Sequence, residues 1–216
     1  MRRLLAVFLL ALTACGGGGT GPAVAPDAPP ATSLIVIGNS ITRTPPSPGF
    51  GWAGDWGMAA SDAAHDFAHL AAGALGLPLD ARNFSALETD LDVAQVPAMA
   101  TGVAGAVVVV QLGDNAGSSG KTPAQWRSAY RALLDATRGV RTLVCVTTFW
   151  GFGQIDAVIR EECTAHGGRV AEIGDIYPDA ANPDRQEVVS ANDAVNQHPH
   201  DYGMARIAER VVAAAR

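Results

Sequence analysis

The chain has no cluster of basic residues, few cysteines and no apolar run long enough to cross a bilayer. Its 216 residues include 15 lysines and arginines against 21 aspartates and glutamates, which gives a formal net charge of −6. An acidic chain without a basic patch binds polyanions poorly, so the composition argues against nucleic acid as a partner. What is present is an N-terminal apolar segment, an alternation of strand and helix patterns, and three short polar motifs.

The first residues have the pattern of an export signal. Arg2 and Arg3 give a positive start, residues 4–12 are apolar, and Leu12-Thr13-Ala14-Cys15 is a small-residue cleavage site that ends in cysteine. These last four residues resemble the lipobox of bacterial lipoproteins, which implies cleavage before Cys15 and lipidation of its sulfur. We therefore predict a signal peptide over 1–14 and a membrane anchor at Cys15, in the bacterial cell envelope and facing the periplasm or the exterior. An ordinary secretory signal with an incidental Cys15 is the alternative.

Glycine, proline, alanine and threonine dominate the next segment. Hardly any apolar side chain larger than valine occurs in residues 16–32, so ordering this segment would cost more entropy than burial returns. We predict a flexible linker over 15–32 and one domain, expected to be monomeric, over 33–216. Cys145 and Cys163 lie in this domain, where either a disulfide or two small buried thiols would fit their surroundings.

Five apolar runs predict buried parallel strands. The runs are unbroken rather than alternating, as in strands that are covered on both faces. They lie at 33–37, 79–84, 106–111, 141–148 and 169–173.

Helical patterns separate these runs. The clearest begins with Thr122-Pro123-Ala124-Gln125, a capping box with proline at the first helical position. Further helices are predicted over 61–75 and from about 201. Strand and helix in turn predict a three-layer α/β/α sandwich around a central parallel five-stranded sheet, a flavodoxin-like arrangement that binds ligands beyond the carboxyl ends of its strands.

Three polar motifs supply the groups of a serine hydrolase. Ser40 follows the first strand, Asn115 follows the third, and His198 precedes the last helix. A hydroxyl nucleophile needs a base to take its proton and N–H donors to stabilise the oxyanion that it creates. The end of a strand is also where this fold class places its sites.

The combination resembles the SGNH subgroup of the GDSL esterase and lipase family, over the whole of residues 33–216. By that resemblance Ser40 is the nucleophile, and its backbone amide and the Asn115 side chain are the oxyanion donors. His198 is the general base by the same likeness. The resemblance implies hydrolysis of carboxylic esters through an acyl-enzyme, on a small-molecule or carbohydrate ester, without a metal or an organic cofactor. A catalytically degenerate lipoprotein that binds glycan is the alternative.

The sequence departs from the family pattern at several positions. Asn39 replaces the usual aspartate before the serine, and residues 83–89 lack the usual oxyanion glycine. The position three before His198, where the family has its third triad member, is Val195. We predict that Asp193 orients the imidazole instead. A backbone carbonyl, another acid, or a Ser-His dyad without an orienting group are the alternatives.

Two further hypotheses concern substrate and metal. Trp52 and Trp56, in the long connection 41–60, and Trp150, after the fourth strand, are predicted to bind substrate by stacking on sugar rings, although the first two could instead brace the loop. His65 and His69 have the spacing of zinc ligands on a helix, but Asp66 stands where such a motif has glutamate, and no third ligand is evident. His200 is a second candidate base, which the family pattern disfavours.

Overall fold

The apolar runs pair into one parallel sheet with the strand order β2-β1-β3-β4-β5. In the computed structural model, which describes residues 30–216, the strands are β1 (Leu34–Gly38), β2 (Leu79–Asn83), β3 (Val107–Gln111), β4 (Thr142–Val146) and β5 (Arg169–Ala171). The predicted signal peptide, Cys15 and most of the predicted linker lie outside the described residues. Within the described residues, no helix combines the length and the hydropathy that a bilayer crossing requires.

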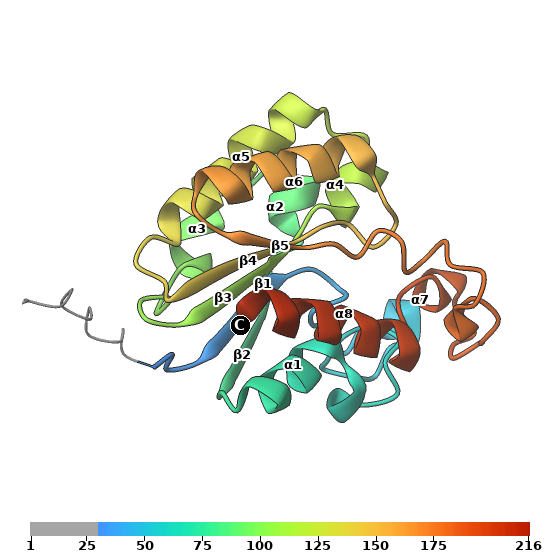
Figure 1. Ribbon diagram of the computed structural model, residues 1–216. Coiled ribbons are helices and arrows are strands. Elements are labelled where there is room, and N and C mark those ends of the chain that lie inside the picture. The colour runs from blue at the N-terminus through green and yellow to red at the C-terminus, as the bar shows by residue number, and fades with distance from the viewer. Residues whose placement is uncertain (1–29) are drawn as a thin grey trace, which may run out of the picture.

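Helices cover both faces of the sheet (Figure 1). On one face α1 (Phe67–Leu75) lies beside α8 (Asp201–Ala215), and on the other α5 (Pro123–Ala136) lies beside α6 (Gly153–Ala165). Shorter helices occupy the connections: α2 (Ala86–Thr89), α3 (Val96–Met99), α4 (Asp114–Ser118), α7 (Asp193–Asn196), and the 3₁₀ turns η1 (Pro48–Phe50), η2 (Ala63–His65), η3 (Val93–Gln95) and η4 (Pro183–Arg185). The predicted three-layer sandwich with a five-stranded parallel sheet is confirmed.

The predicted capping box at the start of α5 is confirmed. Thr122 and Gln125 exchange the reciprocal side-chain and backbone hydrogen bonds that start the helix. The four inward residues are fully buried against the sheet: Trp126, Tyr130, Leu133 and Leu134. An amphipathic helix gains most of its stability from burying such a stripe.

Three elements differ from the prediction. The helix predicted over 61–75 begins only at Phe67, because Asp66 has extended backbone and its carboxylate accepts a hydrogen bond from the His69 amide at 2.8 Å. β2 and β5 are only partly buried, since each forms an edge of the sheet and has a neighbour on one side only.

A disulfide joins Cys145 on β4 to Cys163 on α6. Both residues are fully buried in the core between the sheet and α5 and α6. The bond closes a loop with a sequence separation of 18 residues. A cross-link stabilises a fold mainly by restricting its unfolded chain, and a loop of this size contributes roughly 3 kcal/mol.

We therefore expect reduction to lower the free energy of unfolding by roughly 3 kcal/mol. Urea unfolding followed by circular dichroism, with and without reductant, measures this change. The double variant Cys145→Ala/Cys163→Ala is the control, because its stability should not respond to reductant. A wild-type unfolding midpoint that is the same in both conditions would contradict the cross-link.

Candidate active site

The sheet order brings two of the three motifs to one point. β1 is paired with β2 on one side and β3 on the other, and Gly38 at its end lies opposite Asn83 and Gln111. The connections from β1 and from β3 leave in opposite directions, so a crevice opens between these two strand ends. Ser40 and Asn115 follow these ends directly.

The turn that presents Ser40 is fixed by Asn39 and Gly38. Asn39 Oδ1 accepts a hydrogen bond from the Ile41 amide at 3.0 Å, and the Asn39 carbonyl accepts one from the Thr42 amide at 3.1 Å. A side chain at Gly38 would place its Cβ 1.9 Å from Thr42 Oγ1, so the turn requires glycine. Among the described residues the backbone amide of Ser40 has no acceptor, which leaves this N–H available to a ligand.

Ser40 and His198 form a hydrogen bond of 2.8 Å between Oγ and Nε2. His198 Nδ1 lies 2.8 Å from the carbonyl oxygen of Ala194 in α7. Since a carbonyl can only accept, Nδ1 carries the ring proton and Nε2 presents its lone pair to the serine hydroxyl. Burial lowers the pKa of His198 below its ordinary value, so the imidazole is neutral at pH 7 and able to take a proton.

The Ala194 carbonyl occupies the place predicted for the Asp193 carboxylate. Asp193 is exposed, and no hydrogen bond between its side chain and His198 occurs in the described part of the chain. Asp193 is the first residue of α7, and its own carbonyl accepts from the Gln197 amide. The one-turn helix thus points a backbone oxygen, rather than a carboxylate, at the imidazole.

Asn115 lies with Ser40 and His198 on the wall of one cavity of about 720 Å³. Among the described residues that line this cavity, His198 is the only titratable one. Its apolar wall comes from residues that the sequence analysis did not single out, together with Trp150: Phe50, Met58 and Phe152. Its polar wall carries hydroxyl and amide groups, including those of Asn83, Ser85 and Ser118.

The segment 83–89 reaches the cavity wall at Asn83, Ser85 and Thr89. Ser85 lines the cavity, but its amide donates to Asn83 Oδ1 at 3.0 Å. The Ser40 amide, which has no acceptor among the described residues, and the Asn115 side chain, which lines the cavity, remain the candidate oxyanion donors.

Two carboxyl groups that the sequence analysis did not single out for a role are buried beneath these motifs. Glu88 and Asp114 are both almost fully buried, and the side-chain amide of Asn39 lies between them, 3.2 Å from Glu88 Oε1 and 3.5 Å from Asp114 Oδ2. Burial, and then the charge of Glu88, raise the pKa of Asp114 to about 8. Burial also raises the pKa of Glu88. Two like charges at this distance disfavour each other, so at neutral pH the pair carries one negative charge in preference to two.

Of the three tryptophans predicted to bind substrate, Trp150 lies at the cavity wall and Trp52 and Trp56 do not. Trp150 lines the cavity and packs edge-on against the His198 ring, with a centroid distance of 5.7 Å. Trp52 and Trp56 do not line it. Their indole N–H groups donate to the carbonyls of Thr44 and Ala60, both at 2.9 Å, and their rings pack against each other. They brace the loop 41–60, so substrate stacking on Trp52 and Trp56 is not supported by this geometry.

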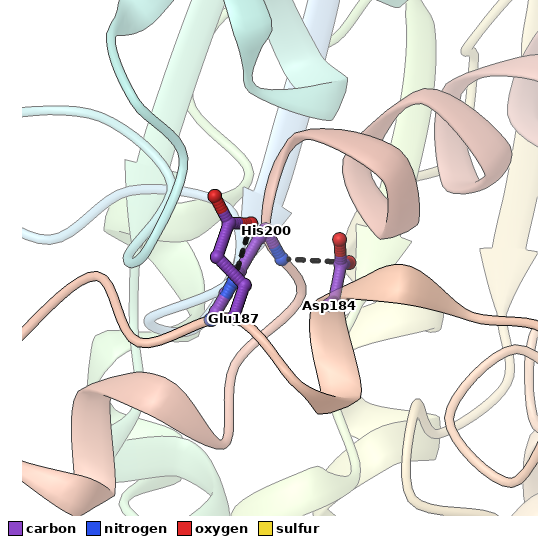
Figure 2. Close-up of side chains that lie close together, drawn as sticks. All are labelled: Asp184, Glu187 and His200. Atoms are coloured by element: carbon purple, nitrogen blue, oxygen red, sulfur yellow. Dashed lines mark hydrogen bonds and ion pairs between the residues drawn. The ribbon is translucent and has the colours of Figure 1, made fainter.

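The remaining histidines lie away from Ser40. Figure 2 shows His200, whose Nδ1 is 3.1 Å from Glu187 and whose backbone amide donates to Asp184 at 3.0 Å. The side chain of His200 is buried and turned to this cluster, so it cannot act as the base. His65 and His69 are not on one helix, because η2 ends at His65 and α1 begins after Asp66. Each pairs with its own aspartate, and among the described residues neither belongs to a group of three side chains that could hold a metal ion.

Comparison with known structures identifies the fold. An α/β-hydrolase from the metagenome of Lake Arreo superposes with a TM-score of 0.64 at 17% identity, over 86% of this chain and 96% of that chain. A member of the lipolytic G-D-S-L family from Veillonella parvula gives 0.56 at 13%, over 85% and 97%. A family 3 carbohydrate esterase from Clostridium thermocellum gives 0.55 at 16%, over 83% and 92%. Neither a protein-family model nor a curated protein matches the chain. The chain thus has the fold of these structures, among them a lipolytic protein of the G-D-S-L family.

The orientation of His198 by a carbonyl has a measurable consequence. In ¹⁵N-labelled protein the His198 ring should titrate below the ordinary value of 6.5 and carry its proton on Nδ1. Asp193→Ala should leave this pKa unchanged, because the carboxylate does not contact the ring. An ionic partner raises the pKa of a histidine, so a further fall of the His198 pKa in Asp193→Ala would show that Asp193 pairs with the ring after all.

Proposed function

We propose that this chain is a serine esterase that hydrolyses carboxylic esters through an acyl-enzyme formed on Ser40. The observation that carries the proposal is the 2.8 Å hydrogen bond from Ser40 to His198 at the wall of a cavity that Asn115 also lines. Nucleophile, base and oxyanion donor come from three distant segments, and packing alone gives no reason for them to meet here. The fold, which esterases share, supports the same conclusion.

The steps follow from the geometry. As Ser40 Oγ attacks the ester carbonyl carbon, His198 Nε2 takes its proton. The oxygen of the tetrahedral intermediate becomes negative and is stabilised by the Ser40 amide and the Asn115 side chain, each donor contributing roughly 3 kcal/mol. The intermediate collapses, and His198 returns the proton to the leaving alkoxide. Water, activated by the same imidazole, then releases the acid and restores the serine.

The Ala194 carbonyl performs one of the two roles of a triad carboxylate. It fixes the tautomer, and a wrong tautomer is what costs about 10⁴ in rate when asparagine replaces the triad aspartate of a serine protease. It does not supply a full negative charge to the imidazolium that forms during catalysis. We therefore infer a working esterase with a lower turnover than one with a carboxylate in this position.

For the substrate we propose a small acyl group, such as acetyl, on a carbohydrate. The cavity wall has no lysine or arginine to pair with a charged acyl group. Its aromatic side chains can stack on a sugar ring, and its hydroxyl and amide groups can bond sugar hydroxyls. One structure of this fold is a carbohydrate esterase. An envelope position with a Cys15 lipid anchor remains a prediction from the sequence.

A glycan-binding protein without activity is the second candidate. The observation that favours it is the absence of a carboxylate at His198 Nδ1. The hydrogen bond between Ser40 and His198 weighs against it, because sugar binding does not require a base beside a hydroxyl.

Esterase activity should depend on both Ser40 and His198. We expect wild-type protein to hydrolyse p-nitrophenyl acetate and to react with a fluorophosphonate probe, and Ser40→Ala to lose the labelling and at least about 10³-fold of kcat. His198→Ala should lose a similar factor. Tyr202→Phe, on α8 and away from the cavity, is the control. Equal turnover in wild type, Ser40→Ala and His198→Ala would remove the catalytic assignment and favour glycan binding.

Phe50 provides a test of the substrate class. It lines the cavity and is 46% exposed, so its ring is free to stack on a sugar. Phe50→Ala should raise KM for acetylated xylo-oligosaccharide by about 2- to 10-fold, with a smaller change for p-nitrophenyl acetate. Tyr202→Ala, also an exposed aromatic, should change neither value. An equal effect of Phe50→Ala on both substrates would argue against carbohydrate recognition at this wall.

A further inference from the structure

A buried carboxylate lies directly behind the oxyanion amide. Glu88 is 0% exposed, and its Oε2 accepts a hydrogen bond of 2.7 Å from Asn115 Nδ2. Its Oε1 accepts from the Gly113 amide at 2.5 Å, from Asn39 Nδ2 at 3.2 Å and from the Asn115 amide at 3.3 Å. Four N–H groups from two separate segments therefore point at one carboxylate.

Glu88 has no cationic partner among the described residues, in contrast to Glu162. Glu162 is similarly buried, but Arg127 and Arg131 neutralise its charge at 2.7 Å. A buried charge without a counter-ion is costly unless hydrogen bonds to its ionised form replace the lost water. The four N–H groups replace the water that Glu88 lost on burial. If one of them turned away, the Glu88 carboxylate would be less well solvated. Glu88 therefore restrains the groups that bind it.

The chemistry of the contact fixes which end of the Asn115 side chain faces Glu88. An asparagine amide can present either its donor Nδ2 or its acceptor Oδ1, but an ionised carboxylate only accepts. Nδ2 must therefore face Glu88. One of its two hydrogens is used in this bond, and the second remains for another acceptor, such as an oxyanion in the cavity that Asn115 lines.

Glu88 also connects the oxyanion motif to the nucleophile motif. Asn39, which it binds through Nδ2, uses its Oδ1 to fix the turn that carries Ser40. Gly113, at a φ of 139° that favours glycine, begins the turn that carries Asn115. One carboxylate thus holds the end of the β1 turn and the end of the β3 turn at a fixed separation.

We propose that Glu88 is a positioning residue of this site, which holds the Asn115 side-chain amide in the orientation that stabilises the oxyanion formed on Ser40. The inference rests on the proposed function. Glu88 acts through Asn115 and does not contact substrate, so its effect should appear in the rate of acyl transfer rather than in binding.

The test is a double-mutant cycle of Glu88→Gln with Asn115→Ala. Glu88→Gln keeps the shape but replaces one acceptor oxygen by a group that carries hydrogens toward existing donors. We expect it to lower kcat for p-nitrophenyl acetate by about 10- to 100-fold with little change in KM, since a misaligned oxyanion donor loses most of its effect. In the Asn115→Ala background the same substitution should change kcat less than about twofold, because the residue through which it acts is gone.

Glu162→Gln is the matched control. It makes the same chemical change at another buried glutamate, so we expect it to lower the unfolding midpoint and leave kcat unaltered. The assignment is overturned if Glu88→Gln retains wild-type kcat, or if it lowers kcat equally in the presence and absence of the Asn115 side chain. The second result would mean that Glu88 only supports the fold. If Glu88→Gln does not fold, the double-mutant cycle is repeated with Glu88→Asp. This substitution keeps the charge but moves the carboxylate oxygens away from Asn115, and the same two outcomes for kcat decide the assignment.

A second measurement does not depend on activity. The two side-chain N–H groups of Asn115 give NMR signals that can be assigned through their loss in Asn115→Ala. We expect these signals to be well separated in wild type and to shift strongly in Glu88→Gln. Glu162→Gln should leave them in place. Unchanged signals would overturn the contact. Failure of the proposed esterase function would show in a different variant, as activity that Ser40→Ala retains. It can therefore be distinguished from failure of the Glu88 assignment.

Discussion

The parallel register of β1 against β3 is the constraint on which the site depends. Gly38 and Gln111 are opposite each other, so the two strands end at the same height and their following turns start side by side. Both strands are fully buried, and a shift in register would move charged or polar turn residues into the sheet. The sheet thus determines the separation between Ser40 and Asn115, and the loop before α8 only has to bring His198 to the same place.

His198 is oriented by the shape of α7 rather than by a charge. The helix has a single turn, and its Ala194 carbonyl is left without an intrahelical partner, as carbonyls at the end of every helix are. Such a carbonyl is an available acceptor, and here the imidazole Nδ1 uses it. Val195, which stands where the related pattern has its acid, is fully buried with Met58 and Ala59. An unpaired carboxylate at that position would have to be desolvated, which explains why an apolar side chain fits it in this fold.

The acidic groups of the site lie beneath the reacting atoms instead of beside them. Glu88 and Asp114 are buried among amides, while the cavity itself has no acid or base other than His198. This arrangement keeps negative charge behind the N–H donors, where it orients them, and away from the position where an oxyanion would form. The raised pKa of Asp114 reduces the charge of the pair at neutral pH, which limits the cost of burying it.

The pattern of apolar runs and polar motifs was enough to predict the layers of the fold and the edge of the sheet that carries the site. Unbroken apolar runs predict strands covered on both faces, and this holds for β1, β3 and nearly all of β4 but not for the edge strands β2 and β5. Because parallel strands end at one edge, motifs that follow them predict where Ser40 and Asn115 lie. Four features came from the folded arrangement instead: Ala194 orients His198, Glu88 holds Asn115, Trp52 and Trp56 brace a loop, and Cys145 bonds Cys163. The reason is physical: a backbone carbonyl has no residue-type signature, and a glutamate becomes a buried acceptor only when segments distant in the chain surround it with donors.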